Sequence, residues 1–115
     1  MFKNFMRAAT GPNPLETDVA EAISARADGT TQIVDVREPE EWRGGHIPGA
    51  IHIPLGQLQQ RHGKLDSTRP VIIVCRSGNR SLVAARMLKS VGFGEVKSLA
   101  GGMIAWASAG QRIQR

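Results

Sequence analysis

The stretch that decides the fold reads Val71-Ile72-Ile73-Val74-Cys75-Arg76-Ser77-Gly78-Asn79-Arg80-Ser81. It opens with four consecutive β-branched residues, a pattern typical of a strand that is buried on both faces in a parallel sheet. The residues from Cys75 to Arg80 are mostly polar or small and predict a short loop. This loop therefore leaves the carboxyl end of a buried strand, the edge at which open α/β sheets bind ligands.

The clearest predicted helix follows directly, from Ser81 to about Val91. Its apolar residues fall at positions i, i+3, i+4 and i+7, which places them on one face of a helix; they are Ala84, Met87, Leu88 and Val91. Gly92 and Gly94 bound the carboxyl end of this helix. Strand, loop and helix together form one unit of an alternating α/β chain.

Further strands and helices alternate on both sides of this unit. Short strands are predicted at 33–36, 51–53 and 96–99, and helices at about 18–27, 38–42, 55–62 and 103–108. Thr17 or Asp18 is expected to cap the first helix, and Asp28-Gly29 to end it. The alternation predicts an α/β fold with a mostly parallel central sheet and helices on both faces.

The chain of 115 residues is long enough for one domain with one core. Residues 1–14 end in Gly11-Pro12-Asn13-Pro14, a turn signal, and are interpreted as an N-terminal arm or linker. Docking to a partner is one hypothesis for this arm. Residues 15–115 are expected to form the domain. Phe2 to Thr10 is not a convincing strand, so the position of the first strand of the sheet stays open.

The formal net charge of +5 and the sequence pI of about 10.4 favour anionic partners. The Lys and Arg residues are scattered, and no basic helix, zinc-finger spacing or aromatic RNA-binding strand occurs, so we expect no nucleic acid partner. No apolar run of about 18 residues occurs, so we expect no membrane span. A single cysteine cannot form an internal disulfide, which favours a reducing, cytoplasmic location.

Cys75 is the candidate nucleophile. Gly78 and Asn79 tolerate unusual backbone angles, so the loop can curl into a bowl of N–H groups at the start of a helix, an arrangement that binds anions. This environment should lower the thiol pKa below the ~8.5 of free cysteine, and Arg76 and Arg80 add positive charge. A thiolate in such a loop needs no partner base. The alternative, a buried structural thiol, suits a strand interior better than a loop.

Four motifs occur in order along the chain. They are Asp35-Val36-Arg37-Glu38, His46-Ile47-Pro48-Gly49-Ala50, the loop from Cys75 to Arg80, and Gly101-Gly102-Met103-Ile104-Ala105-Trp106. Together, over residues 31–108, they resemble a single-domain rhodanese, a thiosulfate sulfurtransferase-type domain. The resemblance implies that Cys75 takes the outer sulfur of thiosulfate or a persulfide donor and holds it as a persulfide. Cyanide or a thiol then accepts this sulfur, and neither a cofactor nor a metal is implied.

The resemblance also implies a set of site residues around Cys75. The substrate-binding residues are those of the loop and the residue after it: Arg76, Ser77, Gly78, Asn79, Arg80 and Ser81. Asp35 and Arg37 are expected to support the fold around the site as an ion pair rather than to take part in the chemistry.

Residues near these motifs receive structural interpretations. His46 is interpreted as a hydrogen-bonding structural residue, because His52 and His62 make no metal-ligand spacing with it. Trp42 and Trp106 are interpreted as core residues. For Met103 and Ile104 two interpretations stay open: a cover over the substrate pocket, or ordinary core packing.

The loop length separates this chain from related phosphatases of the dual-specificity, cell-cycle type, which use a longer loop. The tyrosine-phosphatase pattern, Cys followed by five residues and Arg, would need Arg at position 81, which is Ser81. We therefore do not expect phosphatase chemistry. The resemblance to mercaptopyruvate-type relatives implies a loop with fewer charges in those proteins. Arg76 and Arg80 therefore favour a thiosulfate-like anion as the substrate of this chain.

Three functions stay open on the sequence alone. The first is a sulfurtransferase that turns over small substrates. The second is a persulfide carrier or sensor that takes sulfur from one protein and hands it to another. The third is a binding module whose loop only captures an anion. The expected partners are accordingly a small anionic sulfur donor and a thiol or protein acceptor.

Overall fold

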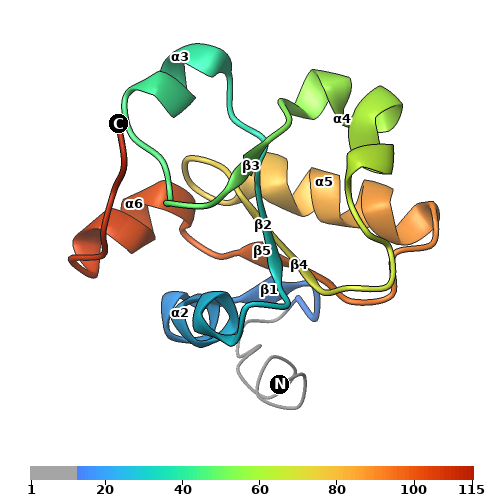
Figure 1. Ribbon diagram of the computed structural model, residues 1–115, viewed down its shortest axis with the longest axis horizontal. Helices are drawn as coiled ribbons and strands as arrows, with labels where there is room; N and C mark the ends of the chain where they lie inside the picture. Colours follow the sequence, from blue (N-terminus) through green and yellow to red (C-terminus); the bar gives the residue numbers. More distant parts are fainter. Residues whose placement is uncertain (1–12) are drawn as a thin grey trace.

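The structure is a computed structural model that describes residues 13–115. Its centre is a five-stranded sheet in the order β1-β5-β4-β2-β3 (Figure 1). Every neighbouring pair of strands is parallel. The strands are β1 (Glu16–Thr17), β2 (Gln32–Asp35), β3 (Ile51–His52), β4 (Val71–Val74) and β5 (Val96–Leu99). The predicted α/β fold with a parallel sheet is confirmed, and β4 is its central strand.

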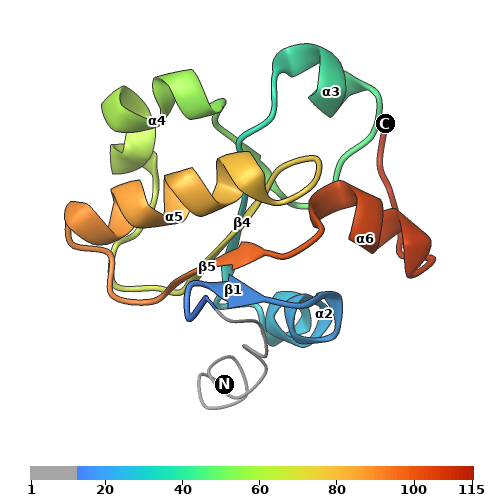
Figure 2. The ribbon, with the colours of Figure 1, turned by 180° about the vertical axis from the view of Figure 1, so that it is seen from behind.

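Helices cover both faces of this sheet, as Figures 1 and 2 show. They are α2 (Val19–Asp28), α3 (Pro39–Arg43), α4 (Leu55–Arg61), α5 (Asn79–Ser90) and α6 (Gly102–Ser108), with a 3₁₀ turn η1 (His62–Lys64) after α4. Residues of α4 and α5 share one core cluster with the sheet, and residues of α2 and α6 share the other. None of the helices within residues 13–115 is long and apolar enough to span a bilayer.

The side chains of β4 alternate between these two clusters. Val71 and Ile73 pack on the side of α4 and α5, and Ile72 and Val74 pack on the side of α2 and α6. All four are at most 1% exposed, as expected for a central parallel strand. Because the alternation continues past the end of the strand, the Cys75 side chain belongs to the cluster on the α5 side.

Helix α2 begins and ends close to the predicted residues. Its N-cap is Asp18, whose Oδ1 accepts the backbone N–H of Glu21 at 2.9 Å. Gly29 ends it with φ +84°. Thr17, the other candidate cap, instead pairs with Leu99 as the last residue of β1.

The start of α5 differs from the prediction. The helix begins at Asn79 rather than Ser81, because Gly78 turns the chain with φ +112° and serves as the N-cap. Arg80 is therefore not the last loop residue but lies in the first turn of the helix. At the other end, Val91 lies beyond the helix and is 45% exposed, so it does not extend the buried face as predicted.

The first strand lies at Glu16–Thr17, where no strand was predicted. It is only two residues long and contains no β-branched run, and its pairing with β5 is what makes it a strand. Of the predicted arm at residues 1–14, only Asn13 and Pro14 are described. Asn13 Oδ1 accepts the N–H of Leu15 and turns the chain into β1. The hypothesis of partner docking by this arm concerns residues that otherwise lie outside the described range.

Candidate functional site

Cys75 lies at the carboxyl end of the central strand, and its side chain is almost completely covered, with 1% of its surface exposed. The backbone N–H of Gly78 donates to Cys75 Sγ at 3.0 Å. The Ser81 hydroxyl lies 3.4 Å from the same sulfur. The sulfur therefore lies inside the turn that joins β4 to α5, as the loop sequence predicts.

The loop tunes the acidity of this thiol. Burial is the largest single influence and raises the pKa of Cys75. Hydrogen bonds from the Ser81 hydroxyl and from the backbone N–H groups of Ser81, Gly78 and Ser77 together outweigh it, so the pKa lies below the ordinary value of a cysteine. These donors stabilise the thiolate, which is the nucleophilic form of the side chain.

The hydroxyl of Ser81, which faces the sulfur, is held by a second buried serine, Ser98. Ser81 Oγ lies 2.6 Å from Ser98 Oγ and 3.1 Å from the carbonyl oxygen of Gly78. Both serines have no exposed surface. Ser98 comes from β5 and was not predicted as a site residue. A buried polar residue in a short strand was the available signal, since such groups need a hydrogen-bond partner.

The amino end of α6 anchors the outer side of the loop. The backbone N–H of Met103 donates to the carbonyl of Cys75 at 2.8 Å, and that of Ile104 donates to the carbonyl of Arg76 at 3.1 Å. Gly102, with φ +54°, permits this approach, because a Cβ there would lie 2.6 Å from the Arg76 carbonyl oxygen. The Gly101-Gly102 motif thus joins α6 to the loop between β4 and α5, residues 75–78, which we call the active loop.

Arg80 forms a two-pronged ion pair with Glu41 of α3. Its Nη1 and Nη2 lie 2.7 and 2.9 Å from the two carboxylate oxygens. The hydrogen bond with Arg80 is the main cause that lowers the pKa of Glu41 to about 2. Glu41 in turn raises the pKa of Arg80. The charge of Arg80 is therefore compensated in this structure, and its role in binding substrate stays a prediction.

The aromatic residues near α3 are arranged differently from the prediction. Trp42 stacks with two imidazole rings, and its ring centroid lies 3.5 Å from that of His46 and 4.7 Å from that of His52. It is half-buried, so the prediction that it is a core residue is wrong, whereas Trp106 is 2% exposed and confirms it. His46 Nδ1 lies 2.8 Å from the carbonyl of Trp42, so His46 is the hydrogen-bonding residue expected.

Asp35 and Arg37 form the predicted ion pair at the end of β2. Arg37 Nη2 lies 2.8 Å from Asp35 Oδ2 and donates to the carbonyl of Gly45 at 2.7 Å. Asp35 is 1% exposed and Arg37 6%, so both charges are buried and satisfied by each other. The pair ties β2 to the loop after α3, which is the supporting arrangement that we expected.

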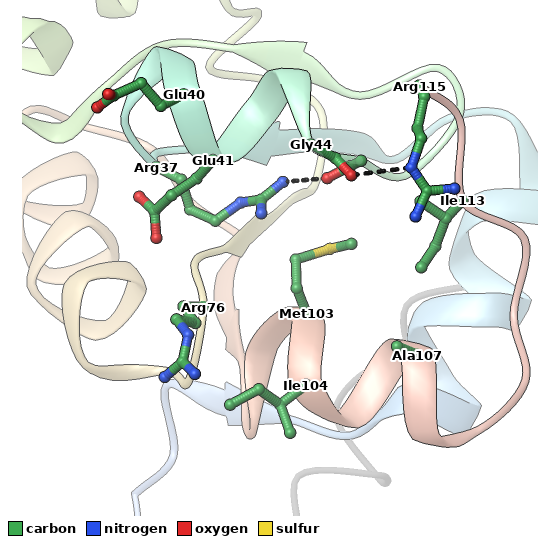
Figure 3. A pocket seen from close by; sticks show the side chains of 11 residues that line it. Arg37, Glu40, Glu41, Gly44, Arg76, Met103, Ile104, Ala107, Ile113 and Arg115 are labelled. Carbon is green, nitrogen blue, oxygen red and sulfur yellow. Dashed lines mark hydrogen bonds between the residues drawn. The ribbon is translucent and has the colours of Figure 1, made fainter.

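The remaining loop residues lie at the rim. Arg76, Ser77 and Asn79 are exposed, and Arg76 lines a pocket of about 380 Å³ next to the loop (Figure 3). Met103 and Ile104 also line this pocket. Met103 is buried and belongs to a core cluster as well, whereas Ile104 is 48% exposed. Core packing therefore holds for Met103 but not for Ile104. Both residues line the pocket, and its use by a substrate stays a prediction.

Within residues 13–115, no cluster of three or more His, Cys, Asp or Glu side chains has the geometry to hold a metal ion. The loop after β4 brings together one thiol and its hydrogen-bond donors. A cysteine with a lowered pKa, held among hydrogen-bond donors between a central parallel strand and a helix, is typical of α/β proteins whose thiolate attacks an electrophilic atom of an anionic substrate.

Comparison with known proteins identifies the family. The Rhodanese-like domain family matches residues 18–109, most of the chain. The chain belongs to this family, as the four motifs predicted.

Relatives agree with this assignment. Over 80 residues the chain is 44% identical to a Bacillus subtilis protein named "Putative sulfur carrier protein YrkF", a match that covers 70% of this chain. The chain spans only 43% of that relative's length. The solved human single-domain sulfurtransferase TSTD1 is 27% identical, with a TM-score of 0.74 over 82% of this chain and 96% of the human one. A rhodanese-related protein from Thermoplasma volcanium is 26% identical, with a TM-score of 0.78 over 86% and 96% of the two chains.

Proposed function

We propose that the protein is a sulfurtransferase that moves a sulfane sulfur from thiosulfate or a persulfide donor to cyanide or a thiol through a persulfide on Cys75. The observation that carries the proposal is the position of Cys75 Sγ, which accepts the N–H of Gly78 at 3.0 Å and lies beside the Ser81 hydroxyl. Family membership supports sulfur transfer in general. A cytoplasmic location is part of the proposal, because a lone persulfide-forming thiol suits a reducing compartment.

The first half-reaction loads the sulfur. The Cys75 thiolate attacks the outer sulfur of thiosulfate, a new S–S bond forms, and the old S–S bond breaks with its electron pair leaving on sulfite. The enzyme then holds a persulfide anion. The donors that lower the pKa of Cys75 lie around its Sγ, and we expect them to stabilise the persulfide anion next to it as well.

The second half-reaction unloads the sulfur. Cyanide attacks the outer sulfur of the persulfide, the bond to Cys75 Sγ breaks, and thiocyanate leaves while the thiolate is restored. The charge on the enzyme is the same before and after the cycle, so no external oxidant or reductant is needed. Because Cys75 is 1% exposed, a donor that presents a single slender terminal sulfur reaches it more easily than a bulky one.

A thiocyanate assay with thiosulfate and cyanide tests this cycle. Wild type should form thiocyanate with turnover, and Cys75→Ser should form none above the uncatalysed rate, because the hydroxyl cannot carry sulfane sulfur. Ser90→Ala, on the exposed side of α5 and away from the loop, is a matched control that keeps the nucleophile and its donors. Full activity of Cys75→Ser would contradict the mechanism.

A second candidate is a persulfide carrier that works with protein partners rather than by turnover of small substrates. The name of the Bacillus relative favours it, as does the compensated charge of Arg80, which leaves fewer free cations for a small anion. A carrier would gain one sulfur from the donor quickly but release thiocyanate slowly. Rates of loading and of thiocyanate release, measured on the same sample, separate the two candidates.

A further inference from the structure

A second pocket lies at the opposite edge of the sheet from Cys75. Its volume of about 520 Å³ is within the range of roughly 300–1,000 Å³ that is usual for sites of organic ligands. Its lining includes Gln32 and Ile33 at the start of β2 and Ile51 at the start of β3. Because the strands are parallel, these amino ends lie away from the carboxyl end of β4, where the active loop begins (Figure 1).

Three basic side chains line this pocket. Arg26 comes from the last turn of α2, Lys64 from η1 and Arg69 from the segment before β4. None of the described residues that line the pocket is acidic, and no acidic side chain within residues 13–115 forms an ion pair with any of the three. The pocket is therefore a local concentration of positive charge, which favours an anionic ligand.

The acidic residues closest to this lining in the sequence lie outside it. Asp28 adjoins the pocket next to Gly29 but does not line it. Asp66 Oδ1 accepts the backbone N–H and the hydroxyl of Thr68 at 2.9 and 2.6 Å. These two hydrogen bonds are the main causes that lower the pKa of Asp66, and the charge of Arg69 contributes less. Asp66 is thus held by Thr68 and leaves Arg69 to the pocket.

Both arginines are held by their inner nitrogen atoms. Arg26 Nε donates to the carbonyl of Pro48 at 3.0 Å, and Arg69 Nε donates to the carbonyl of Thr30 at 2.9 Å. No hydrogen bond within residues 13–115 uses a terminal Nη atom of either side chain. Each guanidinium is therefore oriented by the protein while its outer N–H groups stay available, an arrangement that suits the oxygen atoms of a phosphate.

The pocket also has an apolar part. Pro48 and Ile51 line it and are half-buried. The side-chain amide of Gln32 is not available to a ligand, because it donates to the carbonyl of Asp66 at 2.9 Å and accepts the N–H of Asp66 at 2.8 Å. A ligand that fits this lining combines an anionic group with a small apolar skeleton.

We propose that this pocket binds a small organic phosphate and that Arg26 and Arg69 supply the N–H groups that bind it. Three cations without an acid favour a group with more than one negative charge, and a phosphate monoester carries about −1.5 to −2 at pH 7. The inference goes beyond the proposed function and does not depend on it, since the pocket contains no residue of the active loop.

Phenyl phosphate is the probe, and the backbone amide signals of the protein in NMR spectra report where it binds. The amides of Thr31 and Gly49, which line the pocket, should shift and saturate. Phenol lacks the phosphate and should leave them unchanged. Inorganic phosphate should bind more weakly, because it cannot contact Pro48 and Ile51. Shifts confined to the active loop, shifts that do not saturate, or equal affinity for the two phosphates would overturn the inference.

Arginine variants separate a built site from a merely basic surface. Arg69→Gln and Arg26→Gln should each weaken the binding of phenyl phosphate about fivefold, the effect of one partly exposed ion pair. Arg69→Lys keeps the charge but lacks the planar fork, so it should recover little of the loss. Arg86→Gln, exposed on α5 and outside the pocket, is the matched control and should bind like wild type. Full binding by Arg69→Lys, or an equal loss in Arg86→Gln, would show that net charge alone attracts the probe and would overturn the inference.

Discussion

At the scale of single residues, the reactivity of Cys75 depends on partners that are distant in the sequence. The Ser81 hydroxyl lowers the pKa of the thiol more than any other hydrogen-bonding group does, and Ser98 holds that hydroxyl from β5. Without these groups the burial of Cys75 would favour the neutral thiol, which is a poor nucleophile.

Ser81→Ala tests this dependence. The variant should raise the pKa of Cys75 by roughly half a unit to one unit, the equivalent of one lost hydrogen bond. The pH dependence of alkylation by iodoacetamide reports the change, and the single cysteine makes the reaction specific. Ser90→Ala, exposed on the same helix, should leave the midpoint unchanged. An unshifted midpoint in Ser81→Ala would show that the backbone donors alone set the acidity.

The sequence predicts the nucleophile and its loop because both belong to one continuous motif. The same holds for the pair of Asp35 and Arg37, which are two residues apart. The partners of the loop are different. Ser81 and Ser98 are 17 residues apart, and Glu41 and Arg80 are 39 apart, so only the folded chain shows that they meet.

At the scale of elements, α3 is held against the active loop by polar contacts, since none of its residues is buried. Glu41 pairs with Arg80, and Trp42 stacks with two histidines of the following segment. A helix of five residues has little stability of its own, so these contacts decide its position.

Glu41→Gln should lower the free energy of unfolding by about 0.5–1 kcal/mol at neutral pH, the usual contribution of a partly exposed ion pair. The folded pKa of Glu41 is about 2, below its ordinary 4.5. The stabilisation is therefore present above the ordinary value and disappears as the pH falls through about 2. Urea unfolding at a series of pH values measures it. Glu40 lies in the same turn and forms no ion pair within residues 13–115, so Glu40→Gln should cost almost nothing. A pH-independent loss in Glu41→Gln would contradict the account.

The contact between α6 and the loop predicts a large effect at Gly102. In Gly102→Ala the new methyl group would clash with the backbone carbonyls of Cys75 and Arg76 at a positive φ. We expect a loss of more than about 2 kcal/mol in unfolding free energy. Gly110→Ala is the matched control. Gly110 also has a positive φ, +72°, but no atom of residues 13–115 outside its chain neighbours lies within 4 Å of the added Cβ, so the variant should lose only about 1 kcal/mol. Equal losses in the two variants would mean that the close approach contributes nothing.

Element boundaries show where sequence patterns are insufficient. The apolar spacing predicts α5 well, but its start lies two residues earlier, because the conformation of Gly78 rather than the apolar pattern begins the helix. Strand β1 was not predicted, since two residues carry no periodic pattern and their strand geometry comes from pairing with β5.

At the scale of the whole molecule, the sheet separates two core clusters, and the one on the α5 side contains Cys75. Alternation of strands and helices in the sequence predicts such layers. It does not predict the strand order, because the order depends on which strands pair across the sheet. That order makes β4 central and places β5, with Ser98, beside it.

Two variants, Leu88→Ala and Val91→Ala, test the packing on the α5 side of the sheet. Leu88 has no exposed surface, so Leu88→Ala should lower the unfolding free energy by roughly 2–4 kcal/mol. Val91 was predicted on the same apolar face but is 45% exposed, and Val91→Ala should cost less than about 1 kcal/mol. Chemical unfolding measures both. Similar costs would place Val91 in the core, contrary to the structure.

Intact-protein mass spectrometry after incubation with thiosulfate tests the central claim most directly, since it detects the Cys75 persulfide itself. Wild type should gain the mass of one sulfur atom, lose it again when cyanide is added, and show no gain when Cys75 is replaced by Ser. A wild-type protein that gains no sulfur from thiosulfate or from a persulfide donor, or a Cys75→Ser protein that gains it equally, would contradict the claim that Cys75 carries the transferred sulfur.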